Sequence, residues 1–310
     1  MIPNAPLFRD PIFDGAADPV IIWNKNERNW WIFYTARRAY APNIGVSYMH
    51  GSDIGIASSG DGGKTWIYRG KAKGLAFEEG QNTYWAPEVI EQDGVYHMYL
   101  SYVRGIAFDW NCGRDIVHYT SKDLWNWEFQ SKLELTSDRV IDACVIQLPE
   151  QGFKMWYKDE VHGCFTYTAY SRDLYRWQAG EAEITDCAHE GPNVFWLEGF
   201  YWMITDPWEG LGVYRSVDAR EWKRCGNILD RPGIRKDDGA IGCHADVLVH
   251  KGRAYIFYFT HPEVGMEERN APEFLREYRH RRSSLQVAEL KVSNSGLVCD
   301  RNHVEIDLEP

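Results

Sequence analysis

Residues 121–127 read SKDLWNW, and this pattern indicates the architecture because it recurs along the chain. A serine is followed two residues later by an aspartate and four residues after that by a tryptophan, and the same spacing returns at 171–177 and 216–222. A version one residue longer occupies 59–66. Each copy lies between two short runs that are typical of strands. An aspartate at a turn can cap its own backbone while the tryptophan packs over the hairpin. The pattern therefore predicts a repeated β-hairpin.

A second repeat precedes each of these hairpins. It consists of a short strand with a valine near its start, a turn rich in Gly or Asn, and a strand rich in aromatic residues. The shared valines are Val20, Val89, Val145, Val194 and Val247. Two patterns in register at intervals of roughly 50 residues predict an all-β protein, a five-bladed β-propeller with four antiparallel strands per blade. A β-sandwich would also supply short strands, but it would not repeat both patterns in register.

We expect residues 1–310 to form a single domain, since no interdomain linker is visible. The predicted blades lie near 17–72, 85–133, 140–182, 190–229 and 243–298. A strongly charged segment at 265–283 interrupts the fifth blade, and we interpret it as a loop or short helix inserted on one face. Residues 1–16 are expected to help close the ring.

The composition narrows the classes of partner. The net charge of -11 argues against nucleic acid, which binds a basic face. No apolar run approaches the roughly 20 residues that a membrane helix needs. Aromatic residues make up 15% of the chain, which suits stacking on neutral polar ligands such as sugars, although aromatic residues also fill β-sheet cores. Seven cysteines without a CxxC pair, and a start without signal-peptide features, favour a cytoplasmic location.

Side chains of several chemical types stand where the innermost strands begin. In a propeller these strands line the central axis, so residues at their N-terminal ends converge on one cavity. The residues expected there are three carboxylates, an imidazole and an indole: Asp18, Asp142, Glu190, His244 and Trp85. Glu88 lies one position deeper, and we interpret it as a structural partner.

Converging carboxylates repel one another, and both this repulsion and burial raise a carboxyl pKa. A protonated acid that faces an ionised base is what hydrolysis of a glycosidic bond needs. We expect Tyr84 and then Trp85 to enter the cavity from the second blade, with Trp85 under the sugar. His189 is expected to bond the acid or the sugar, and Trp208 to wall the pocket from a loop.

The order of the short motifs resembles glycoside hydrolase family 43. These motifs are Ala-Asp-Pro at 17–19, Trp-Ala-Pro-Glu-Val at 85–89, Ile-Asp at 141–142 and Glu-Gly-Pro at 190–192, and the resemblance spans roughly residues 12–290. The resemblance implies an inverting hydrolase with Asp18 as general base, Glu190 as general acid and Asp142 as the group that tunes and orients the acid. The chain departs from the family pattern at Ala143, where the family often has proline.

The same resemblance implies a substrate class and an ion. The family is best known for releasing α-L-arabinofuranose or β-D-xylose from plant polysaccharides and their fragments, so a small oligosaccharide is the expected partner. A short chain with loop insertions favours exo action. Members often hold Ca²⁺ or a water-ringed ion with an axial histidine, which would be His244 here, although Ca²⁺ prefers oxygen ligands and a hydrogen-bonded axial histidine is the alternative.

Three other functions stay open. A sialidase-like enzyme is suggested by the turn at 59–66, but such an enzyme needs an arginine cluster and usually six blades. A propeller phosphorylase would need basic groups for phosphate near one carboxylate. In a non-catalytic carbohydrate-binding propeller, Asp18, Asp142 and Glu190 would only bind hydroxyl groups.

Overall fold

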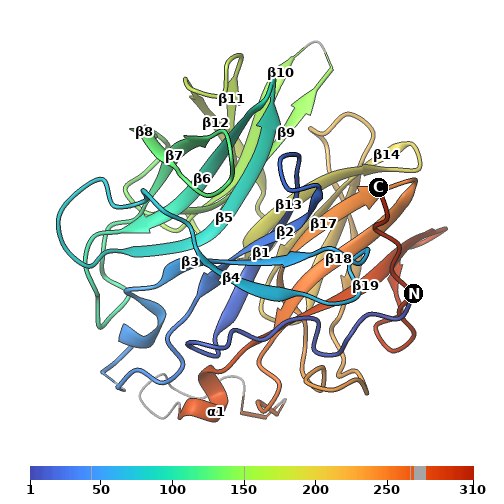
Figure 1. Cartoon of the computed structure of the whole chain (residues 1–310). Coiled ribbons are helices and arrows are strands. Elements are labelled where there is room, and N and C mark those ends of the chain that lie inside the picture. The colour runs from blue at the N-terminus through green and yellow to red at the C-terminus, as the bar shows by residue number, and fades with distance from the viewer. Residues whose placement is uncertain (43, 150, 266, 269–276) are drawn as a thin grey trace.

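Five four-stranded antiparallel sheets surround one axis in the computed structural model, which describes residues 1–310 except 43, 150, 266 and 269–276 (Figure 1). Within each sheet the strands are paired in chain order. The first strand of each sheet contacts the first strands of the sheets on either side, so the first strands form the inner ring. The predicted five-bladed propeller with four antiparallel strands per blade is therefore confirmed.

The strands of the five blades have the following bounds. Blade one holds β1 (Ala16–Asn24), β2 (Asn29–Ala36), β3 (Asp53–Ser59) and β4 (Ile67–Lys71). Blade two holds β5 (Thr83–Gln92), β6 (Val95–Val103), β7 (Asp115–Ser121) and β8 (Glu128–Lys132). Blade three holds β9 (Val140–Leu148), β10 (Gly152–Asp159), β11 (Phe165–Ser171) and β12 (Gln178–Ile184). Blade four holds β13 (Glu190–Leu197), β14 (Phe200–Asp206), β15 (Leu211–Ser216) and β16 (Lys223–Ile228). Blade five holds β17 (Cys243–His250), β18 (Arg253–Thr260), β19 (Ser284–Ser293) and β20 (Gly296–Cys299).

The Ser-x-Asp pattern forms the predicted turn. One carboxylate oxygen of Asp123 accepts hydrogen bonds of 2.8 Å from the backbone N–H groups of Trp125 and Asn126. The indole of Trp127 is buried and donates to the carbonyl of Leu124 at 3.0 Å. The turn residues thus satisfy their own polar groups while the tryptophan covers the hairpin.

Side chains near the axis link each blade to the next. The residue just before the repeated valine in blades two to five accepts a hydrogen bond from a backbone N–H of the following blade. These bonds run from Val145 to Glu88, Val194 to Cys144, Val247 to Asn193 and Ile21 to Asp246. Glu88 is therefore a structural partner, as its deeper position predicted.

A β-bulge distorts the start of every inner strand. The pairing register shifts around Asp18 in β1, Ala86 in β5, Asp142 in β9, Gly191 in β13 and His244 in β17. The first four of these residues have positive φ angles, between 42° and 60°. A bulge bends and twists a strand and re-aims its side chains. Two successive residues of one strand can therefore face the axis near its beginning.

The chain closes the ring through its N-terminal segment. Phe8 forms an antiparallel bridge with Leu285 of β19, and the backbone of Gly15 bridges Ser283, before the chain enters β1. Both termini lie near blade five in Figure 1, where the Met1 ammonium donates to the carbonyl of Ile306 at 2.9 Å. Residues 1–16 thus join blade five to blade one, as predicted.

Helix is scarce in the described residues. It consists of a 3₁₀ turn at Ser47–Met49 and the short helix α1 (Tyr278–Arg281), which belongs to the predicted blade-five insertion. Residues 266 and 269–276 of that insertion lie outside the described part of the chain. None of the described helices has the length and apolar character that crossing a membrane requires.

Candidate active site

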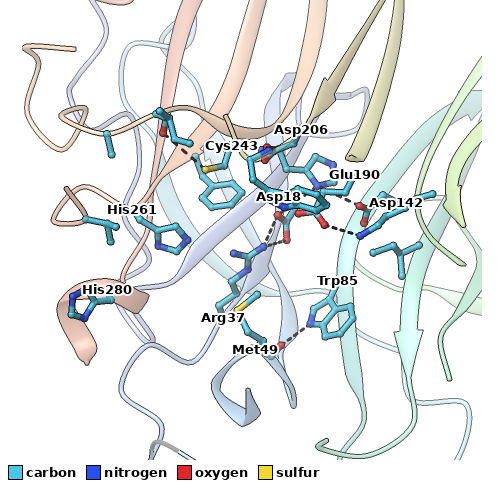
Figure 2. A pocket seen from close by; sticks show the side chains of 18 of the residues that line it. Asp18, Arg37, Met49, Trp85, Asp142, Glu190, Asp206, Cys243, His261 and His280 are labelled. Carbon is cyan, nitrogen blue, oxygen red and sulfur yellow. Dashed lines mark hydrogen bonds and ion pairs between the residues drawn. The ribbon is translucent and has the colours of Figure 1, made fainter. Parts of the chain in front are cut away.

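A pocket of about 470 Å³ opens at the end of the axis where the inner strands begin. Its floor carries Asp18, Asp142 and Glu190, so the three predicted carboxylates share one cavity (Figure 2). Asp18 and Asp142 occupy bulge positions with φ of 48° and 60°, whereas Glu190 immediately precedes the bulge residue Gly191. The carboxylates therefore come from two neighbouring positions of the repeat. A non-glycine residue in this region of φ costs about 1–3 kcal/mol and is found most often at functional sites.

Asp18 is buried in an ion pair with Arg37. Nη2 of Arg37 lies 2.8 and 3.0 Å from the two carboxylate oxygens of Asp18, and Nδ1 of His244 lies 3.6 Å from Oδ1. Burial alone would raise the pKa of Asp18, but the charges of Arg37 and His244 outweigh it, and the pKa lies below its ordinary value. Asp18 is thus held in its ionised, basic form.

Asp142 has a different electrostatic environment. Its Oδ2 accepts a hydrogen bond of 3.1 Å from the backbone N–H of Gly191 and lies 4.0 Å from Nδ1 of His244. Burial and the neighbouring Glu190 raise the pKa of Asp142 to about 6, against the attraction of His244 and Lys158. Asp142 therefore exchanges its proton near neutral pH.

Glu190 is paired with a buried lysine. Nζ of Lys158, which lies on β10 of blade three, is 3.1 Å from Oε2 of Glu190. Burial alone would raise the pKa of Glu190, but the charges of Lys158 and His244 outweigh it, so the pKa lies below its ordinary value. Without a substrate, Glu190 is an ionised carboxylate in an ion pair.

A fourth carboxylate, Asp206, lines the pocket at the end of β14, directly opposite Glu190 in the strand pairing. Its two oxygens accept hydrogen bonds of 2.8 Å from the backbone N–H groups of His244 and Trp208. Burial and the charge of Glu190 raise the pKa of Asp206 to about 7. Asp206 therefore ties blade four to blade five and fixes the start of the loop that carries Trp208.

His244 stands among these carboxylates. Burial alone would lower its pKa, but Asp142, Asp18, Glu190 and Asp206 outweigh burial, so the pKa is raised above its ordinary value. A Cβ on Gly191 would lie 2.8 Å from the imidazole ring, so only glycine leaves room for the ring at this place. The raised pKa favours the imidazolium form of His244 between the carboxylates that flank it.

The surroundings of His244 fit an imidazolium better than Ca²⁺. Ca²⁺ takes six to eight oxygen ligands, whereas both oxygens of Asp18 already accept from Arg37. Within the described residues, three metal-binding side chains come close enough together only at Asp186, Cys187 and His189, a group without His244. A cation beside His244 would also have to replace the charge that the imidazolium supplies.

Tryptophans line the pocket. Trp85 lines it from blade two, where its indole N–H donates to the carbonyl of Met49 at 2.6 Å and its ring packs edge-on against His50 at 4.9 Å (Figure 2). Trp110 lines the same side. Trp208 also lines the pocket with 44% of its surface exposed, and Nζ of Lys158 lies 5.3 Å from its ring centre. Aromatic faces of this kind can stack against a sugar ring.

Two predicted site residues do not line the pocket. Tyr84 packs in the core between blades one and two, and its hydroxyl donates to the carbonyl of Leu75 at 2.9 Å. Successive side chains of a strand point to opposite faces, so Tyr84 turns away where Trp85 turns inward. His189 is fully buried, with Nε2 2.6 Å from the hydroxyl of Thr166 and Nδ1 2.8 Å from the carbonyl of Cys187. Neither residue is placed to contact a sugar in the pocket.

The charged partners of the carboxylates were absent from the sequence prediction. Arg37 directly follows β2, Lys158 lies near the end of β10, and Asp206 ends β14. The end of each second strand pairs with the beginning of its inner strand, as Lys158 pairs with Ile141. Pairing the two predicted strands of each blade would have placed these residues at the axis.

The insertion in blade five forms the remaining wall. His261 and His280 lie across the pocket from Trp85 in Figure 2, and Glu268 also lines the pocket. The insertion is fixed to blade one, because Tyr278 of α1 stacks on Tyr40 with ring centres 4.4 Å apart. The described part of the insertion thus contributes to the site.

The comparisons with known proteins agree on the fold. No protein-family model and no curated protein matches the chain. Among solved structures, a thermostable family-43 glycoside hydrolase aligns with a TM-score of 0.67 and 17% identity over 98% of this chain and 99% of its own. A GH43 β-1,3-galactosidase with galactodeoxynojirimycin gives 0.69 and 15% over 98% and 99%. The GH43_1 enzyme from Xanthomonas citri complexed with xylose gives 0.66 and 12% over 92% and 90%. At these identities the likeness establishes the propeller fold.

Proposed function

We propose that the chain is a glycoside hydrolase of the family 43 type, exo-acting and inverting. The observation that carries the proposal is the convergence of Asp18, Asp142 and Glu190, from three different blades, on the floor of one pocket. The solved structures with this fold include glycosidases crystallised with xylose and xylotriose, which supports an oligosaccharide as substrate. We further propose α-L-arabinofuranose or β-D-xylose as the sugar released.

In this proposal the two ion-paired carboxylates have opposite tasks. Asp18, kept ionised by Arg37, takes a proton from the attacking water. Glu190 donates a proton to the oxygen of the leaving group, and Asp142, which bonds the backbone next to Glu190, fixes its orientation. The water attacks the face of the sugar opposite the leaving group, so the configuration inverts.

The charges around the reacting sugar also suit this reaction. Six carboxyl groups line the pocket, beside the cationic side chains Arg37, Arg114 and Lys158 and the ring of His244, whose pKa is raised. Hydrolysis passes through a transition state with oxocarbenium character, and the ionised carboxylate of Asp18 stabilises positive charge that develops on the sugar. A sialidase-like enzyme would need an arginine cluster for the substrate carboxylate, whereas Arg37 and Arg114, the arginines that line the pocket, are each paired with a carboxylate.

The lining of the pocket supports exo action. Trp85, Trp110 and Trp208 line it together with His261 and His280 of blade five. A pocket walled by such bulky side chains suits the end of a chain, whereas an endo-acting enzyme needs an open groove. The product expected from a linear oligosaccharide is therefore a monosaccharide.

The proposal is tested by a panel of 4-nitrophenyl glycosides that contains α-L-arabinofuranoside, β-D-xyloside and β-D-galactoside. Release of nitrophenol from one of the two pentosides, lost in the Glu190 and Asp18 variants described below, is the expected result. Absence of release from every glycoside, together with binding of the free sugars, would support the carbohydrate-binding alternative.

A phosphorylase is the second candidate, and one observation favours it. Arg37 beside Asp18 and Lys158 beside Glu190 are basic groups of the kind that phosphate binding requires. Each is already neutralised by its carboxylate, which leaves little net positive charge for phosphate. Running the panel with and without inorganic phosphate separates the two, since a phosphorylase releases sugar 1-phosphate and depends on phosphate.

A further inference from the structure

Lys158 is a buried lysine with two carboxylate partners. Only 4% of the residue is exposed, and its ammonium lies 3.1 Å from Oε2 of Glu190 and 3.1 Å from Oε1 of Glu160. The same ammonium lies 5.3 Å from the ring centre of Trp208. One buried cation therefore contacts the proposed general acid and a wall of the pocket at the same time.

The contacts continue beyond Lys158 as a chain of alternating charges. Glu160 also forms an ion pair with Arg114, which is 2% exposed and comes from blade two. Nη2 of Arg114 donates to the carbonyl of Trp110 at 2.7 Å. The chain Glu190–Lys158–Glu160–Arg114 thus runs from blade four through blade three to blade two and ends at another tryptophan of the pocket.

We propose that Lys158 is a positioning residue for Glu190: it holds the Glu190 carboxylate beside the wall formed by Trp208 and confines proton donation by Glu190 to acidic pH. This inference rests on the proposed function, in which Glu190 is the general acid. A general acid must carry its proton when the leaving group departs. An ammonium at hydrogen-bond distance favours the ionised carboxylate, so it restricts the pH range in which the proton is present.

Other groups also act on Glu190 from the neighbouring strands. They are Asp18 of β1, Arg37 after β2, Asp142 of β9, Asp206 of β14, and Cys243 and His244 of β17. Four of these groups, the three aspartates and the cysteine, favour the protonated form of Glu190 whenever they are ionised. Removing Lys158 leaves all of them in place, and it also removes an attraction that lowers the pKa of Asp142.

The test is the pH profile of kcat/KM on the methyl glycoside of the sugar that the panel identifies. An alkyl leaving group needs protonation, so the alkaline limb of the profile follows the proton on Glu190. In Lys158→Met we expect this limb to move upward by about 1–3 pH units, the effect of an opposite charge on a nearby carboxyl group. Lys158→Arg keeps the charge and should keep the limb near its wild-type position.

Lys154 provides a matched control on the same strand. It is 1% exposed, forms an ion pair with Glu183, and its ammonium lies 4.6 Å from the ring centre of Trp156, but it does not line the pocket. Lys154→Met should lower the melting temperature without moving the pH profile. If Lys158→Met behaves in the same way, Lys158 is only structural and the inference is overturned.

Glu160→Gln should move the pH profile in the opposite direction from Lys158→Met. It is also the variant to use if Lys158→Met does not fold. This variant removes the competing carboxylate, so Lys158 acts more strongly on Glu190 and the alkaline limb should move to lower pH. An unmoved limb in folded Glu160→Gln overturns the inference. Different results would contradict the proposed function itself. They are a wild-type protein that hydrolyses no glycoside, or a Glu190→Ala variant that retains full activity on the methyl glycoside.

Discussion

The carboxylates of the pocket differ from one another because each has a different neighbour. Asp18 and Glu190 are paired with Arg37 and Lys158, whereas Asp142 has no such partner at hydrogen-bond distance among the described residues. The pKa of Asp142 is accordingly raised to about 6, while the pKa values of the other two are lowered. The charged neighbours thus separate Asp142 from Asp18 and Glu190 by the direction of the pKa shift.

Replacement of Glu190 by alanine should affect substrates according to their leaving group. Methyl glycosides need protonation of the departing oxygen, so kcat/KM should fall by about 10²–10⁴-fold. Activated aryl glycosides depart without help and should lose much less. Steady-state kinetics on the two substrate types measures this difference, and equal losses on both would contradict the role of Glu190 as general acid.

Replacement of Asp18 by alanine should reduce turnover of both substrate types, because water must be activated in either case. The expected loss is again about 10²–10⁴-fold. Azide added to this variant should partly restore turnover if a small anion can enter from the side of the base. A variant with turnover near that of the wild type would show that Asp18 is not the base.

Chelation tests the nature of the positive charge at His244. Since the imidazolium already faces Asp18 and Asp142, EDTA should change neither kcat/KM nor the melting temperature. If EDTA lowers kcat/KM or the melting temperature and added Ca²⁺ restores it, an axial ion is present, as the resemblance to family 43 implies.

At the scale of the strand, the bulge is what turns a repeated structural unit into a site. Blade three presents Ile141 and Asp142 to the pocket at the start of its inner strand, and blade five presents Cys243 and His244. Deeper in the same strands, Glu88 and Asp246 serve the contacts between blades instead. Position along the strand therefore separates the proposed catalytic groups from the groups that join neighbouring blades.

Glu88 should make stability depend on pH. Burial and the neighbouring Asp246 raise its pKa to about 8. Such a carboxyl group makes its full contribution to the free energy of unfolding below its pKa in the unfolded chain, which is about 4.3. This contribution is lost as the pH rises through the pKa of the group in the folded protein. Glu88→Gln keeps an acceptor for Val145 without this dependence.

Glu88→Gln changes the free energy of unfolding, and we expect this change to be more stabilising at pH 8 than at pH 5. The expected difference between the two pH values is on the order of 1–3 kcal/mol. Denaturant unfolding at the two pH values measures the difference. An equal effect at both values would mean that Glu88 is ionised in the folded protein.

For the whole molecule, the parts that repeat could be predicted and the parts that do not repeat could not. The valines and the Ser-x-Asp turns recur, so their spacing predicted the blades and placed Asp18, Asp142 and Glu190 on one axis. Arg37, Lys158 and Asp206 occur once each, at strand ends that share no residue type, and only the pairing of strands brings them to the axis. Tyr84 and His189 were misplaced because proximity in sequence does not fix the face of a strand.

Closure of the ring should depend on the N-terminal segment. Phe8 is 5% exposed, packs against Tyr34 with ring centres 5.2 Å apart, and bonds Leu285 through its backbone. Phe8→Ala should cost about 3–5 kcal/mol of unfolding free energy. Phe108, which is 67% exposed, provides the control, since Phe108→Ala should cost little. Equal unfolding free energies for the two variants would place ring closure elsewhere.

The stereochemistry of hydrolysis tests whether three carboxylates on the propeller axis hydrolyse a glycosidic bond. Proton NMR of the wild-type protein acting on the aryl glycoside it accepts should show the inverted anomer first, before mutarotation, and no product with Asp18→Ala. First appearance of the retained anomer would indicate a covalent intermediate and contradict the assignment of Asp18 as base. Absence of any hydrolysis would contradict the claim as a whole.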